Sequence, residues 1–238
     1  MSDTLGFDLN EVHKRHAELS PEFGFEKSMQ MLNRLGAFRT KHLARINVDG
    51  AFDFAVNDLG YQLQRCGYSI AVSYACLAEG LSEFQHLNEG PSRYFPSRID
   101  RLFFYYVDDS YSNLYSAWNV LANILALFWV PGSAERVYPT YISKLATRSD
   151  VPQVQIAKLS AYIKAEFLTE IAPVRNKVLH RESSRARYFI DHLRYLDNRD
   201  QLEEARLVRD SQPEILRGHY AQFLAGIDAA IELLQAAQ

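Results

Sequence analysis

The residues of this sequence that are best suited to chemistry lie in the segment APVRNKVLH, from 172 to 180. Arg175 and Asn176 are adjacent there, and His180 follows four residues after Asn176. Histidine exchanges protons near neutral pH because its unperturbed pKa is about 6.5. Arginine holds two phosphate oxygens while it stays charged. Cleavage of RNA without a metal needs such a proton-transfer group and such a cation, so these three residues form a candidate catalytic site.

A single helix does not bring the three side chains together. Asn176 and His180 share a helix face, whereas Arg175 lies about 140° around the helix from His180. Two arrangements remain open. In one, Pro173 bends or restarts the helix before Arg175, because proline is tolerated in a first helical turn but not in a helix interior. In the other, two chains contribute one motif each across a two-fold axis.

A second arginine and histidine pair has the same spacing, Arg187 with His192. No asparagine follows Arg187, and Asp191 four residues later indicates a surface ion pair. We therefore predict a structural role for this second pair. The first motif has a structural alternative as well, in which Arg175 is a surface residue and His180 caps or lines a helix interface.

Basic residues surround the motif. From 175 to 194 there are six lysines and arginines and two acidic residues. This excess indicates either a solvated helix face or a surface that contacts phosphates. In the second interpretation the substrate-binding residues are Lys177, Arg181 and Arg185.

Acidic and aromatic side chains in the segment FFYYVDDSYSNLY bear on the same site. Asp108 and Asp109 either orient His180 or Arg175, or lie on the solvated side of a helix. The four tyrosines of this segment are predicted to be core residues for the most part, although exposed members could stack on single-stranded bases. They are Tyr105, Tyr106, Tyr111 and Tyr115.

Helical periodicity dominates the chain, and no stretch alternates with the period of two that a strand requires. The clearest pattern is a seam with 4-3-4-3 spacing, typical of helices that pack at a shallow angle. It consists of Val107, Tyr111, Leu114, Trp118, Leu121, Leu125 and Phe128.

The other expected helices can be placed on either side of that seam. We expect one from 52 for about 35 residues, stopped near Gly90 and Pro91, and one from Ser97 that carries the seam. A short segment over 138–147, a helix from about 152, a short amphipathic helix over 189–196 and a charged connector follow. Ser211 and Glu214 form a capping box that opens the last helix. The fold class is all-α, an antiparallel helical bundle over 49–238 with an N-terminal helical extension over 1–48.

The composition predicts a soluble, cytoplasmic protein. The start is polar and acidic, which is unlike a signal peptide, and the longest apolar run has 11 residues, whereas a bilayer requires about 20. Cys66 and Cys76 lie in one helical pattern and are predicted to be buried, reduced thiols. The segment HKRH at 13–16 lacks a third metal ligand. We therefore expect neither a metal nor a cofactor. The net charge is −3, so contact with nucleic acid requires a local basic patch.

The order of these features resembles the HEPN superfamily of small all-α domains. The resemblance is carried by Arg175, Asn176 and His180 at a helix bend, and by the aromatic-rich helix upstream, which is similar to that of a poorly characterised bacterial subgroup. It covers roughly 97–185. Many members of the superfamily are metal-independent ribonucleases or toxins, and their site is composite, built at a homodimer interface. Some toxin members carry a tyrosine soon after the histidine, a target for a nucleotidyltransferase. Here the first tyrosine after His180 is Tyr188, which puts that form of regulation in doubt.

The resemblance implies an HEPN-type endoribonuclease that acts on RNA in a toxin–antitoxin or phage-defence setting. Its partners are then a second copy of the chain, with 173–185 at the interface, and an antitoxin or nucleotidyltransferase protein. Two alternatives stay open. One is a catalytically silent module of the same type that binds nucleotides or a protein, and the other is a structural helical dimerisation protein.

Overall fold

The computed structural model is helical in every part that it describes. The described residues are 9–23, 25–46, 50–82, 96–129, 139–180, 183–184, 187–188 and 198–237, and they contain no β-strand. The elements are α1 (Leu9–Phe23), α2 (Phe25–Ile46), α3 (Ala51–Glu79), α4 (Arg98–Trp129), η2 (Pro139–Tyr141), α5 (Ile142–Leu145), α6 (Gln153–Tyr162), η3 (Ile163–Ile171), α7 (Ala172–His180), α9 (Arg199–Asp210) and α10 (Gln212–Ala236).

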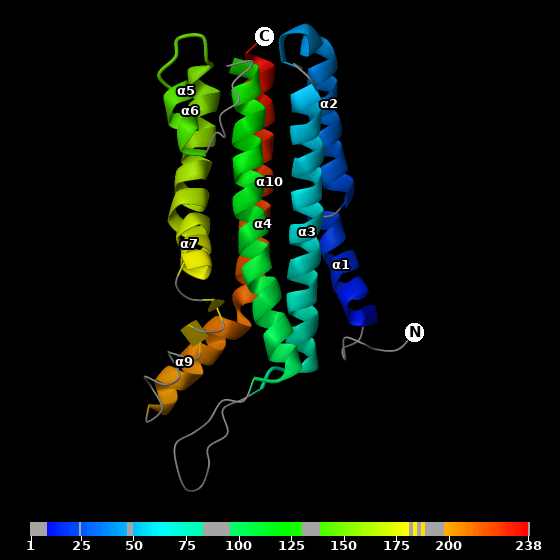
Figure 1. Cartoon of the computed structure of the whole chain (residues 1–238), viewed down its shortest axis with the longest axis vertical. Coiled ribbons are helices and arrows are strands. Elements are labelled where there is room, and N and C mark those ends of the chain that lie inside the picture. Colours follow the sequence, from blue (N-terminus) through cyan, green and yellow to red (C-terminus); the bar gives the residue numbers. More distant parts are fainter. Residues whose placement is uncertain are drawn as a thin grey trace, which may run out of the picture.

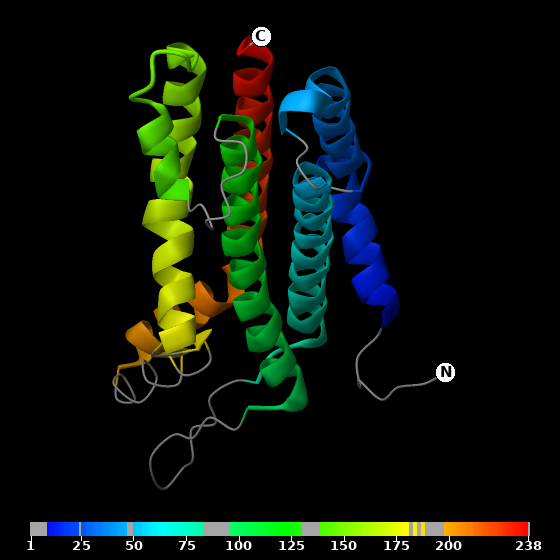
Figure 2. The ribbon, with the colours of Figure 1, turned by 45° about the horizontal axis from the view of Figure 1, so that its top comes forward.

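Helix α4 lies at the centre of the bundle (Figures 1 and 2). Helix α3 runs antiparallel to it on one side, and the continuous run of α6, η3 and α7 flanks it on the other. Helix α10 packs behind α4, while α1 and α2 pack on the far side of α3. The predicted all-helical bundle is therefore confirmed.

The seam of α4 is buried as the sequence predicts. Its seven residues, from Val107 to Phe128, are at most 4% exposed. The helix begins where expected, because the Ser97 hydroxyl accepts from the Asp100 amide at 3.1 Å and the Asp100 carboxylate accepts from the Ser97 amide at 2.7 Å. This reciprocal pair satisfies amides that the first turn leaves without intrahelical partners.

Helix α3 ends earlier than predicted. Its last residue is Glu79, whereas the periodicity suggested a helix that continues to Gly90. The cause is Gly80, which has φ of +94° and donates its amide to the Leu77 carbonyl at 3.2 Å. Only glycine adopts that backbone conformation readily, so the helix stops there.

The run from α6 to α7 contains a π-helical segment, η3, from Ile163 to Ile171. Pro173 follows in the first turn of α7. In a regular α-helix its ring would clash with the carbonyl of the residue four positions earlier. In the π-helical segment η3 the hydrogen bonds join residues five positions apart instead of four, so the carbonyl before Pro173 does not take the position in which the ring would meet it. The predicted restart of the helix before Arg175 is thus found as a change of hydrogen-bond register.

Two predictions near the C-terminus are wrong. The segment 197–210 was expected to be a charged connector, but Arg199–Asp210 forms α9, capped by the Asn198 side chain, which accepts from the Gln201 amide at 3.2 Å. The capping box at Ser211 is not formed, since the Ser211 hydroxyl donates to the Val208 carbonyl and Glu214 instead accepts from Tyr74. Helix α10 nevertheless begins at Gln212, as expected. The predicted helix over 189–196 lies outside the described residues.

The core is continuous from the N-terminal helices to α10. Buried side chains of α1 and α2, among them Val12 and Leu35, belong to the same apolar cluster as Trp118 and Phe223. Cys66 and Cys76 are buried and unbridged, as predicted. None of the described helices combines the length and the apolar character that a membrane crossing requires.

The contact between α4 and α10 is tightest at Gly226, and it generates the first prediction. A Cβ at this position would lie 2.4 Å from Cη2 of Trp118, so Gly226→Ala forces the indole or the helix to move. We expect a loss of about 1–3 kcal/mol of unfolding free energy, measured by chemical denaturation. Gly218→Ala in the same helix is the matched control. It meets no atom within 4 Å and should gain up to about 1 kcal/mol. Equal effects of the two substitutions would contradict the tight contact.

Candidate functional site

Arg175 is held against the central helix. Its guanidinium lies over the Tyr115 ring of α4, 4.3 Å from the ring centre, and its Nη1 is 3.4 Å from the Asn176 side-chain oxygen. The Tyr115 ring in turn packs on Phe167 of η3 at 5.1 Å. One face of the Arg175 guanidinium is therefore covered by the Tyr115 ring. The N–H groups lie in the plane of the guanidinium, so the ring does not cover them.

The remaining motif residues are only partly described. Asn176 and Lys177 are exposed on α7. His180 is the last residue of α7, and its side chain lies outside the described residues, as do Arg181 and Arg185. His192 and Asp191 of the competing pair lie outside them too.

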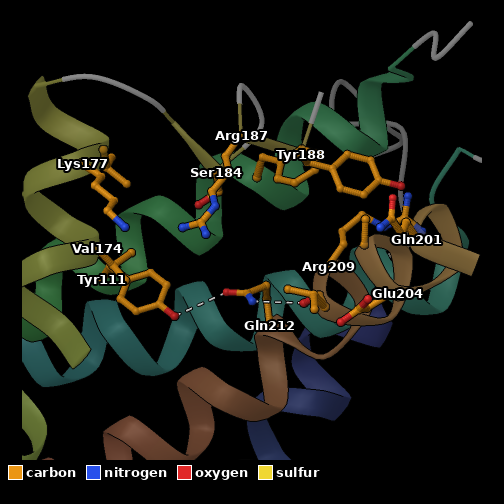
Figure 3. A pocket seen from close by; sticks show the side chains of 14 residues that line it. Tyr111, Val174, Lys177, Ser184, Arg187, Tyr188, Gln201, Glu204, Arg209 and Gln212 are labelled. Carbon is orange, nitrogen blue, oxygen red and sulfur yellow. Dashed lines mark hydrogen bonds between the residues drawn. The ribbon is translucent and has the colours of Figure 1, made fainter. Parts of the chain in front are cut away.

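A cavity of about 580 Å³ opens beside the motif, at the end of the bundle where α4, α7 and α9 meet (Figure 3). From α7 the cavity is lined by Lys177, which follows Asn176 of the motif, and by Val174 and Val178. The other lining residues are Phe104, Tyr111, Ser184, Arg187, Tyr188, Gln201, Glu204, Ala205, Val208, Arg209 and Gln212. Arg175 does not line this cavity.

Two basic side chains reach one end of the cavity, where the carboxylates of Glu170, Glu166 and Asp108 also lie close enough to Tyr111 to add to the effect of burial in raising its pKa. The tips of Lys177 and Arg187 lie on the same side as Tyr111, whereas Gln201 and Glu204 lie at the other end (Figure 3). Lys177 has no ion-pair partner among the described residues. Because an ammonium group near a concave wall attracts anions, this end of the cavity suits a phosphate.

Arg209 has a structural part in the cavity wall. It is 4% exposed, and it donates from Nε to Asp210 at 2.7 Å and from Nη1 to the Ser82 carbonyl at 3.0 Å. Its guanidinium also lies 5.0 Å from the centre of the Tyr188 ring. Burial raises the pKa of Tyr188 to about 12 although Arg209 opposes the shift, so this phenol stays neutral.

Asp108 anchors the segment that carries Arg187. Its carboxylate accepts from the amide of Ser184 at 3.2 Å and from the Ser184 hydroxyl at 2.5 Å. Burial raises the pKa of Asp108, and the two hydrogen bonds from Ser184 act in the opposite direction. The structure shows this contact rather than one that orients Arg175.

Asp109 faces the other side of α4. It accepts from Arg65 at 2.9 Å, from Ser69 at 2.7 Å and from Asn113 at 2.8 Å. It is therefore bound to α3 and to its own helix, and these contacts do not orient the motif either.

A buried histidine and carboxylate pair lies behind the cavity wall. Nδ1 of His219 on α10 is 2.6 Å from the Glu166 carboxylate on η3, and the two side chains are 13% and 9% exposed. The His219 ring is 5.9 Å from that of Tyr111. Burial, with the nearby carboxylates of Glu170, Glu166 and Asp108, raises the pKa of Tyr111 to about 12. Its hydroxyl therefore stays protonated, and it donates to Gln212 at 3.4 Å.

The four predicted core tyrosines fall into two groups. Tyr111 is buried and Tyr106 and Tyr115 are partly buried, but Tyr105 is 59% exposed. Sequence reasoning missed Glu166, His219 and the α9 side of the cavity. The signal for the first two was weak, since 53 residues separate the pair and neither residue stands in a motif.

Comparison of the chain with protein-family models, with curated proteins and with solved structures found no match. The resemblance to the HEPN superfamily thus rests on the motif and on the upstream helix, and it stays a prediction. Among the described residues, no group of three or more His, Cys, Asp or Glu side chains is arranged to hold a metal ion.

The partly buried carboxylate of Asp108 generates the second prediction. Its pKa is higher in the folded than in the unfolded state, so the stability linked to this group is present below the unfolded pKa and is lost as the pH rises through the folded one. Asp108→Asn keeps an oxygen acceptor for Ser184 and removes the charge. We expect it to raise the melting temperature by roughly 1–3 °C at pH 7, with a difference that shrinks toward pH 4.

Asp108→Ala serves as the contrast, because it leaves Ser184 without its acceptor and should lower the melting temperature at both pH values. A variant Asp108→Asn that is less stable than the wild type at pH 7 would show that the carboxylate is favourable in its charged form.

Proposed function

We propose that the cavity between α4, α7 and α9 binds a segment of single-stranded RNA. The observation that carries the proposal is the position of Lys177, which directly follows Asn176 of the motif, lacks an ion-pair partner among the described residues and faces the cavity next to Arg187. Two cations that converge on one end of a cavity suit the phosphate group of a nucleotide.

The rest of the lining supports a nucleotide over a simple anion. The Gln201 amide offers a donor and an acceptor for base and ribose edges. The hydroxyls of Tyr111 and Ser184, whose protons go to Gln212 and Asp108, offer oxygen acceptors. Aromatic and aliphatic side chains form the wall between these groups, and about 580 Å³ lies within the range of about 300–1,000 Å³ typical of small-ligand sites.

The binding proposal generates the third prediction. Lys177→Ala and Arg187→Ala should each weaken binding of a short single-stranded RNA by roughly tenfold, because each removes a charge-assisted contact to phosphate. Each should also lower the salt dependence of binding, since a phosphate contact contributes about 0.7 to the slope for single strands. Fluorescence anisotropy measures both effects.

Lys164→Ala is the matched control. Lys164 is exposed on η3 and does not line the cavity, so the same change of charge should leave affinity within about twofold. An equal loss of RNA affinity for Lys164→Ala and Lys177→Ala would indicate nonspecific electrostatic attraction and would contradict the proposal.

Cleavage of the bound RNA without a metal is a second candidate function. It is favoured by the position of Arg175 and Asn176 on the helix that borders the cavity, two residues and one residue before Lys177. Here His180 would take the proton of the 2′-hydroxyl, whose oxygen attacks phosphorus while the bond from phosphorus to the 5′-oxygen breaks, and the protonated His180 would return that proton to the leaving 5′-oxygen. Arg175 would meet the charge on the phosphorane oxygens, and Asn176 would orient the histidine. Lys177, Arg181 and Arg185 would hold the strand.

The biological setting of such an enzyme rests on the resemblance alone. It would act in toxin–antitoxin control or in phage defence, in the cytoplasm, with an antitoxin or a nucleotidyltransferase as its partner. A composite site would further require two copies that meet through 173–185. The geometry of one chain supports binding more directly than cleavage, since Arg175 is stacked on Tyr115 outside the cavity lining.

The cleavage candidate generates the fourth prediction. His180→Ala and Arg175→Ala should each lower the cleavage rate by about a hundredfold or more, Asn176→Ala by less, and cleavage should persist in excess EDTA and leave 2′,3′-cyclic phosphate ends. Denaturing gels and end-group analysis measure the rate and the products. Melting temperatures separate a lost site from a lost fold.

Arg187→Ala and His192→Ala test the competing pair and should leave the rate of cleavage within a few-fold at saturating RNA. An unaffected rate for His180→Ala, or dependence on Mg²⁺ or Mn²⁺ after chelation, would refute this mechanism. RNA binding without cleavage would leave the binding function standing alone.

A further inference from the structure

The outward face of α3 carries a second seam with 4-3-4-3 spacing. It consists of Phe54, Asp58, Tyr61, Arg65 and Tyr68, which lie within about 40° of one line along the helix at 100° per residue. Its aromatic members are 75%, 56% and 41% exposed in chain order. We call these five residues the outer seam. Exposed aromatic side chains that follow one line, rather than scattered singly, mark an interaction surface.

The side-chain types along the outer seam are complementary to those of a second, antiparallel copy. It reads aromatic, acid, aromatic, base, aromatic. If two copies are placed antiparallel with Tyr61 opposite Tyr61, Phe54 faces Tyr68, and Asp58 faces Arg65 on both sides of the axis. We propose that two copies of this chain pair through the outer seam about a two-fold axis near Tyr61. Such an isologous contact uses one patch on both subunits.

A hollow beside the outer seam has the position to receive an aromatic side chain of the second copy. It measures about 380 Å³ and lies between α3 and α4. Tyr68 forms part of its wall, so Phe54 of the second copy arrives at this hollow in the antiparallel register. The lining residues are Tyr61, Gln64, Arg65, Tyr68, Ser69, Tyr105, Tyr106 and Asp109. The residues that contribute most of the binding energy in protein interfaces are often aromatic side chains inserted into such pockets.

The Arg65 side chain is already held in position within one copy. Its Nη2 donates to Asp109 at 2.9 Å, and its guanidinium lies 5.6 Å from the centre of the Tyr61 ring. Asp109 is held in turn by Ser69 and Asn113. Because the side chain is already ordered, less rotamer entropy is lost when a carboxylate of the second copy approaches.

The chemistry of this face favours a protein over a nucleic acid. Tyrosine, phenylalanine and arginine are enriched at the centre of protein interfaces, and the outer seam and its hollow contain Phe54, four tyrosines and Arg65. Aspartate belongs to the depleted types, and the two aspartates here are the ones set against arginine: Asp109 binds Arg65 within the chain, and Asp58 faces Arg65 of the second copy. Asp109 balances the charge of Arg65 and Asp58 adds a negative charge, so no excess of positive charge remains for phosphates.

This interface is independent of the proposed function. No residue of α3 lines the cavity of Lys177, so pairing through the outer seam leaves both cavities uncovered. It also differs from the interface over 173–185 that the resemblance implies, and an experiment can separate the two.

Light scattering on the full chain provides the first test. The wild type at roughly 10 μM, a concentration at which many specific dimers persist, should have twice the chain mass of 27.3 kDa. Tyr61→Asp places two carboxylates on the axis and Asp58→Lys sets a cation against Arg65, so each should raise the dissociation constant by at least about tenfold. Val154→Asp, at a residue 78% exposed on α6, should leave the mass unchanged.

Oxidative cross-linking tests the register without relying on weakened variants. The native Cys66 and Cys76 are buried, so an introduced thiol reacts alone. Tyr61→Cys should give a disulfide-linked dimer, whereas Val154→Cys and Lys177→Cys should not. The proposal is overturned by a monomeric wild type, by a dimer that Tyr61→Asp leaves intact, or by a dimer that cross-links through Lys177→Cys alone. A monomer whose affinity for RNA falls with Tyr61→Asp would assign the outer seam to RNA instead.

Discussion

Burial of the α4 seam is the constraint on which the rest of the structure depends. Seven residues of one helix face are at most 4% exposed, and each large side chain buried there contributes on the order of 1.5–3 kcal/mol. The seam locks α4 in rotation, and Trp118 against Gly226 leaves no room for a change of register with α10. The other contacts of α4 are therefore made by residues outside the seam.

That remaining surface explains where the candidate site lies. On the side of α7 it presents Tyr115, on which Arg175 stacks, and Phe104, which lines the cavity beside the seam residue Tyr111. The π-helical register of η3 sets the direction of α7 before Pro173. It also places Glu166 where it meets His219, a buried pair that joins η3 to α10 directly behind Tyr111. Long π-helical segments are rare, and short ones occur frequently at functional sites.

The fold was predictable from the sequence because its strongest signals are local. The spacing from Val107 to Phe128 and the face of α10 are repeated over many turns, so a single helix period accounts for them. The end of α3 was missed because Leu81 continued the apolar pattern, although the conformation of Gly80 had already ended the helix. Helix α9 was missed because its apolar residues are few, and Leu202 alone among them is buried.

The cavity could not be predicted in the same way. Its lining comes from positions as far apart as Phe104 and Gln212, and no periodicity connects residues that meet only after the bundle has assembled. The sequence did locate one wall of it, because Lys177 was identified from the basic residues around the motif. It gave no indication that Arg187, assigned a structural role from its spacing to Asp191, would point toward the same space.

The adjacent carboxylates Asp108 and Asp109 show how one helix serves two surfaces. Consecutive residues of a helix point about 100° apart, so the two side chains face opposite neighbours. Asp108 holds Ser184, and with it the segment that brings Arg187 to the cavity. Asp109 holds Arg65 in the outer seam of α3. A rotation of α4 that improved one contact would break the other, and the buried seam prevents such a rotation. The pair therefore sets the cavity and the outer seam at a constant angle to each other, so a dimer formed through α3 would present its two cavities in one defined orientation.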